Sequence, residues 1–85
     1  MKVNFIMKSP EMALEFVKFS SEFVDDIELK NENISVDGKS ILGVLSIGFP
    51  VKVDVIFHSD NPIALRLFDA YITKLLNDYE VKQDD

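Results

Sequence analysis

Four segments of this chain alternate apolar with polar residues, the pattern of strands that bury one face only. They lie at residues 2–7, 26–30, 34–37 and 51–58. The second and third are separated by Asn31-Glu32-Asn33, a turn sequence that predicts a hairpin. Strands of this kind require a sheet with one apolar face, so the fold must cover that face and leave the other to solvent.

Three further segments have the pattern of helices. Ser9-Pro10-Glu11 and Asn61-Pro62 each combine a capping side chain with a proline at the first helical position. We expect the first helix to run for about four turns, from its 3.6-residue periodicity, and the last to span Ile63 to Tyr79. A short helix between them is bounded by Ser40 and Gly48. The apolar stripe of the first helix consists of Ala13, Phe16, Val17, Ser20 and Phe23.

These elements follow one another in the order β-α-β-β-α-β-α. Because each helix has one apolar face, the pattern predicts an α+β fold in which a single sheet is covered by helices on one side only. We expect one domain over residues 1–79 and an acidic tail, residues 80–85, that frays. A ferredoxin-like sandwich, β-α-β-β-α-β, is the main alternative and leaves one helix unexplained.

The composition narrows the range of possible functions. The chain has 85 residues, no cysteine and a net charge of −6, so disulfides and thiolate metal sites are excluded and nothing attracts it to nucleic acid or anionic lipid. An apolar content of 47% with 28% charged residues is ordinary for a folded domain. Since no apolar run is long enough for a signal peptide or a membrane span, we expect a cytoplasmic protein.

The middle of the chain resembles a known family. Residues 39–48, KSILGVLSIG, are similar to the short-helix signature of HPr, the histidine-containing phosphocarrier protein of bacterial sugar phosphotransferase systems. The resemblance implies an open-faced β-sandwich, in which a four-stranded antiparallel sheet carries three helices on one face. The order of the elements extends the match over nearly the whole chain.

The family's reactive histidine and its neighbouring arginine are absent. Counting along the family pattern, Ser9 occupies the histidine position and Glu11 the arginine position. A serine phosphate ester is a poor phosphoryl donor compared with a phosphorylated imidazole. Glu11 would also repel a phosphate that the family's arginine attracts. We therefore expect a protein that is not an enzyme, has no catalytic residue and no cofactor, and uses Ser9 as a helix cap.

Two other features of the family are retained. Ser40 lies where many HPr proteins are phosphorylated by a dedicated kinase, and Lys39 and Gly43 match that motif. A phosphate at a helix N-terminus is favoured by free N–H groups and the helix dipole, so Ser40 is a regulatory phosphorylation candidate as well as a cap. The resemblance also implies an apolar surface for docking protein partners. Its residues are Ile41, Leu42, Leu45 and Phe49.

Two remaining features of the strands bear on function. His58 is the only histidine, and strand alternation places it on the outward face, far from the first helix. It is neither a displaced phosphate carrier nor, without a second histidine, part of a metal site. Ile6 and Ile56 point to the same outward face, on strands that the family pairs, where they could form a small apolar spot, so we expect a monomer or a weak homodimer.

Three functions follow from these observations. The first is a non-catalytic HPr-like protein that regulates or binds phosphotransferase components or an HPr kinase. The second is a phosphocarrier with an atypical serine acceptor, Ser9 or Ser40. The third is a dimerising structural module unrelated to sugar transport.

Overall fold

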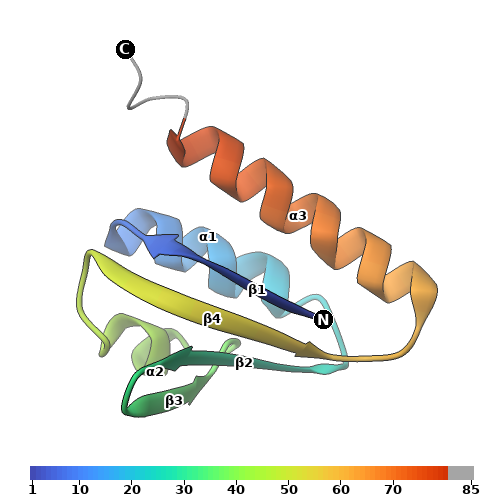
Figure 1. Cartoon of the computed structure of the whole chain (residues 1–85), viewed down its shortest axis with the longest axis horizontal. Coiled ribbons are helices and arrows are strands. Elements are labelled where there is room, and N and C mark those ends of the chain that lie inside the picture. Colours follow the sequence, from blue (N-terminus) through green and yellow to red (C-terminus); the bar gives the residue numbers. More distant parts are fainter. Residues whose placement is uncertain (81–85) are drawn as a thin grey trace.

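The computed structural model describes residues 1–80 and confirms the predicted order of elements (Figure 1). The elements are β1 (Lys2–Met7), α1 (Pro10–Ser20), β2 (Asp26–Asn31), β3 (Ile34–Asp37), α2 (Ile41–Leu45), β4 (Val51–His58) and α3 (Pro62–Glu80). The acidic tail expected from residue 80 onward therefore begins inside α3, and its residues 81–85 lie outside the described residues.

The four strands form one antiparallel sheet in the order β1-β4-β2-β3. β4 lies between β1 and β2, so Val55 faces Val3 on one side and Leu29 on the other. β1 and β3 are the edges, and β1 is the edge nearest α3 in Figure 1. This arrangement excludes the ferredoxin-like alternative, because α3 has a place in the observed order.

The core lies between one face of the sheet and the helices, as the alternation predicts. Every sheet residue in it comes from the expected apolar positions, and all lie nine-tenths or more out of solvent: Phe5, Met7, Ile27, Leu29, Val53, Val55 and Phe57. An aromatic cluster fills the space beneath α1 and α3. In it Phe57 and Phe68 stack with their ring centroids 4.4 Å apart, and Phe23 meets both rings edge-on.

The helix α1 is about one turn shorter than expected from its 3.6-residue period, since it ends at Ser20. The Ser21 hydroxyl donates to the Val17 carbonyl at 2.8 Å, and the N–H of Phe23 then bonds to the carbonyl of Ser20 in a tight turn. Phe23 still reaches the core from this turn. Met12 and Phe19 are also buried, although they lie outside the predicted stripe.

The helix α2 is shorter than its predicted range as well. It ends at Leu45, where the Ser46 hydroxyl donates to the Gly43 carbonyl at 2.6 Å and the Ser46 N–H donates to the Leu42 carbonyl. The chain then turns at Gly48, whose φ of 81° favours a residue without a side chain. In the hairpin, Ile34 is 44% exposed although its alternation points inward, because it starts the short edge strand β3.

Candidate functional site

The start of α1 is held by Ser9. Its backbone is extended, and its hydroxyl oxygen accepts the N–H of Met12 at 3.2 Å. The Ser9 carbonyl accepts the N–H of Ala13, and Pro10 occupies the first helical position. The predicted cap is therefore confirmed. The hydroxyl thereby accepts one of the N–H groups that the first turn of a helix leaves without a partner in the helix.

The only histidine is far from Ser9. Met7, which precedes the start of α1, pairs with Val51, and His58 lies at the opposite end of β4. At roughly 3.3 Å per residue, the seven steps along β4 place His58 about 23 Å away. It also faces the outer side of the sheet, as predicted. His58 therefore supplies neither a base for Ser9 nor a displaced phosphate acceptor.

His58 instead belongs to a polar group on the outer face of the sheet. Its Nε2 atom lies 3.3 Å from Oε1 of Glu28, and the Ser35 hydroxyl donates to Oε2 of the same carboxylate at 2.5 Å. These two contacts, that of Ser35 foremost, lower the pKa of Glu28. His58 and Ser35 bond to different oxygens of the Glu28 carboxylate. In a nucleophile activated by a base, the base would instead bond to the serine hydroxyl. Among residues 1–80 no group of side chains is arranged to hold a metal ion.

The start of α2 is built like that of α1. The Ser40 hydroxyl accepts the N–H of Gly43 at 3.1 Å, and its carbonyl accepts the N–H of Val44. The Lys39 ammonium donates to the Phe23 carbonyl at 2.6 Å, in the turn that follows α1, while the Lys39 N–H donates to a carboxylate oxygen of Asp37. The lysine next to Ser40 is thus bonded to the segment that follows α1.

The four predicted docking residues divide into two pairs. Ile41 is 51% exposed and Leu42 is 83% exposed. Leu45 and Phe49 are half-buried and pack against the core. Val44 is fully buried and fastens the helix to the layer beneath. The surface of α2 therefore presents two large apolar side chains, on a helix whose underside is fixed.

Ile6 and Ile56 do not form a shared apolar spot. Ile6 pairs with Lys52, whereas Ile56 pairs with Lys2, four residues farther along the ladder. The two isoleucines are therefore separated by about 13 Å along the strands. The polar pair of Asn4 and Asp54 lies between them. The strand alternation gave the correct face, but register decides which residues on that face are neighbours.

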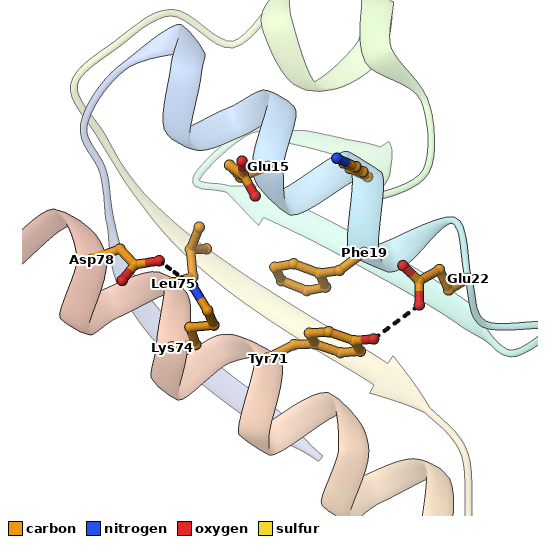
Figure 2. Close-up of a pocket in the computed structure, with 8 residues that line it drawn as sticks. Glu15, Phe19, Glu22, Tyr71, Lys74, Leu75 and Asp78 are labelled. Atoms are coloured by element: carbon orange, nitrogen blue, oxygen red, sulfur yellow. Dashed lines mark hydrogen bonds and ion pairs between the residues drawn. The ribbon is translucent and has the colours of Figure 1, made fainter.

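A groove between α1 and α3 was not predicted (Figure 2). Its volume is about 200 Å³, and its floor is formed by Phe19 stacked on Tyr71, with their ring centroids 5.2 Å apart. The Tyr71 hydroxyl donates to Glu22 at 2.9 Å, and Lys74 pairs with Asp78 at 2.7 Å. Only the second pair has a sequence signal, the four-residue spacing within a helix.

The charges of this groove stabilise one another. The Glu22 carboxylate raises the pKa of Tyr71, first through the hydrogen bond and then through its charge. Asp78 raises the pKa of Lys74 in the same way. Tyr71 therefore remains a neutral phenol and Lys74 an ammonium at neutral pH. Neither is a base or a nucleophile there, and the groove joins two helices through an aromatic stack and a hydrogen bond.

Comparison with known proteins finds one matching family and solved structures with a similar fold. The family model described as PTS HPr component phosphorylation site matches residues 11–78. The crystal structure of HPr-C-His from Thermoanaerobacter tengcongensis is 24% identical, with a TM-score of 0.66, covering 91% of this chain and 96% of that one. The phosphocarrier protein HPr from Bacillus anthracis is 25% identical, with a TM-score of 0.58 and coverage of 82% and 95%. No curated sequence matches.

The fold is thus that of the small phosphocarrier proteins with an open-faced sandwich. Since the family model covers most of its length, the chain belongs to the HPr family of the phosphotransferase system. The match begins at Glu11, two residues after Ser9. None of the helices in residues 1–80 combines the length and apolar character needed to cross a membrane.

Proposed function

We propose that this HPr-family protein does not carry phosphate and acts by binding proteins of the phosphotransferase system. The observation that supports the proposal most strongly is the use of Ser9 as the cap of α1, in the place where the family resemblance puts a histidine. A phosphate ester on that hydroxyl would be a poor phosphoryl donor compared with a phosphorylated imidazole. A phosphoryl group on Ser9 would also lie two residues from Glu11, an exposed carboxylate in the first turn of α1.

Binding is supported by the surface of α2. Leu42 and Ile41 stand out from the molecule, while Val44 holds the helix to the core. Large apolar side chains exposed side by side are costly to leave in water, and they are the residues that a protein interface buries. Because α2 is fixed from beneath, its exposed side chains meet a partner with little loss of conformational freedom.

Incubation with enzyme I and labelled phosphoenolpyruvate tests the absence of a carrier function. We expect no label on the wild-type chain under conditions that label a histidine-containing HPr completely. Binding of enzyme I should persist and should weaken about tenfold, or 1.4 kcal/mol, in Leu42→Ala, because that change removes the most exposed apolar side chain of α2.

Ile63→Ala is the matched control for this experiment, since Ile63 is 74% exposed but lies on α3. It should leave enzyme I binding unchanged. Label on Ser9, or on any other residue, that the chain passes on to a second phosphotransferase protein would show that it is a carrier after all. Equal loss of binding in both variants would remove α2 as the docking surface.

We further propose that Ser40 is a regulatory phosphorylation site. Its hydroxyl lies at the start of α2 with the N–H of Gly43 in reach, so a phosphate there would retain a backbone donor. It would also add negative charge next to Ile41 and Leu42, the exposed apolar pair. A partner that buries those side chains would then have to accept the added charge.

Intact mass after incubation with an HPr kinase and ATP tests this site. We expect one added phosphoryl group on the wild-type chain and on Ser46→Ala, and none on Ser40→Ala. Ser46 is the suitable control because it is the exposed serine at the other end of α2. An unmodified wild-type chain, or a modified Ser40→Ala variant, would contradict the assignment.

A further inference from the structure

The turn between α1 and β2 is fastened to the rest of the molecule at two neighbouring residues. The Tyr71 hydroxyl of α3 donates to the Glu22 carboxylate at 2.9 Å (Figure 2). The Lys39 ammonium, at the entrance of α2, donates to the Phe23 carbonyl at 2.6 Å. The Phe23 ring is buried in the aromatic cluster, so its side chain is fixed independently of its carbonyl. The bond from Lys39 is therefore the polar contact that joins this turn to the start of α2.

The Lys39 ammonium rests on a neutral acceptor. Within residues 1–80 it forms no ion pair, and its bond is to a carbonyl oxygen. The carboxylate of Asp37 accepts the backbone N–H of Lys39 instead. A bond between two ions is stronger than a bond between an ion and a neutral oxygen. An anion placed beside Lys39 would therefore compete with the Phe23 carbonyl for its ammonium.

The backbone next to Lys39 is held without the help of its side chain. The N–H of Gly38 donates to the Ile27 carbonyl at 2.7 Å, and the N–H of Ser40 donates to the Asp37 carbonyl at 3.0 Å. A lysine side chain is a flexible stem of four methylene groups. The ammonium can therefore change its partner while the chain that carries it stays in place.

Phosphorylation of Ser40 would supply such an anion. Ser40 follows Lys39 directly, and a phosphoserine carries a charge of about −1.5 to −2 at neutral pH, with three acceptor oxygens. Lys39 is the only basic residue between Lys30 and Lys52 in the sequence. The charged group on its other side, Asp37, is negative and cannot neutralise a phosphate. Lys39 is thus the cation that sequence and structure place beside the modified serine.

We propose, on the basis of the regulatory site at Ser40, that phosphorylation draws the Lys39 ammonium from the Phe23 carbonyl to the phosphate and so loosens the turn between α1 and β2. The buried Phe23 ring would stay in the aromatic cluster. The change would therefore be confined to the Phe23 carbonyl and to Val24, the next residue, which is 96% exposed. Modification of Ser40 would in this way alter a second surface, on a different segment from α2.

A chain that carries phosphoserine at position 40, introduced by chemical synthesis, tests the proposal without a kinase. The NMR signal of the Phe23 carbonyl carbon reports on the hydrogen bond to its oxygen. We expect phosphoserine to shift this signal in the direction in which Lys39→Met shifts it, because both changes take the ammonium away. In the Lys39→Met chain, phosphoserine at position 40 should leave the signal unchanged.

Two controls show whether the effect is specific. Phosphoserine at position 46 adds the same charge at the other end of α2, and it should not shift the Phe23 signal. Lys18→Met removes an exposed lysine of α1 that has no described bond to the turn. In that variant, phosphoserine at position 40 should shift the Phe23 signal as it does in the wild-type chain.

An unshifted Phe23 signal in the wild-type chain with phosphoserine at position 40 would overturn the proposal, whether or not Lys39→Met folds. Equal shifts in the wild-type and Lys39→Met chains, or an equal shift with phosphoserine at position 46, would overturn it as well. A kinase that leaves the wild-type chain unmodified would remove Ser40 as a regulatory site, which is a different result. The synthetic chain would still show whether the Lys39 ammonium changes its partner.

Discussion

Phe68→Ala is expected to lower the free energy of unfolding by about 3–5 kcal/mol, the usual cost of removing a buried phenylalanine ring. Phe68 is fully buried at the centre of the aromatic cluster. It stacks on Phe57 and meets Phe19 and Phe23 edge-on. The alanine would leave a cavity between α3 and the sheet that these rings cannot fill. Urea unfolding followed by circular dichroism measures the loss.

Leu67→Ala is the matched control, because Leu67 is the preceding residue of α3 and is exposed. It should change the free energy of unfolding by no more than about 0.5 kcal/mol. Since a domain of this size has only about 5–15 kcal/mol in total, the two variants should differ plainly in their urea midpoints. Equal midpoints would mean that the cluster is not the centre of the core.

Gly38→Ala is expected to cost about 1–3 kcal/mol through overpacking. A Cβ atom at Gly38 would lie 2.7 Å from Cγ2 of Ile27, 3.1 Å from its carbonyl oxygen and 3.2 Å from the ring of Phe16. The N–H of Gly38 bonds to that same carbonyl at 2.7 Å, which holds the backbone close to β2. The added methyl group would therefore push the segment before α2 away from the sheet.

A double-mutant cycle with Ile27→Ala identifies the cause. Removing the Ile27 side chain eliminates the shortest of the three contacts, so Gly38→Ala should cost less in that background than in the wild type. The free energies come from urea unfolding of the four proteins. Strictly additive losses would show that the crowding at Cγ2 of Ile27 is not responsible.

Much of the fold was predictable because its elements carry local signals. Alternation gives the limits of β1 and β4 as the structure has them, and a capping residue followed by proline marks the starts of α1 and α3. The ends of α1 and α2 were predicted too far along the chain. At these ends the hydroxyls of Ser21 and Ser46 bond to backbone carbonyls, contacts that leave no periodic trace in the sequence.

The candidate sites likewise include some that local sequence predicts and some that depend on contacts between distant residues. The capping roles of Ser9 and Ser40 depend on residues three positions away, so the sequence predicts them correctly. The separation of Ile6 from Ile56 depends on the register between two distant strands. The contact of Tyr71 with Glu22 joins residues 49 positions apart, and no local pattern foretells it.

The helix α2 is attached to the rest of the protein by contacts that do not involve its exposed apolar side chains. A helix of five residues has too few turns to be stable alone, and α2 is held by the buried side chain of Val44 and by the hydrogen bond from Lys39 to the Phe23 carbonyl. Ile41 and Leu42 take part in neither contact. The residues that hold α2 therefore differ from those of the proposed docking surface, so substitution of Ile41 or Leu42 would change that surface and leave the attachment of the helix intact.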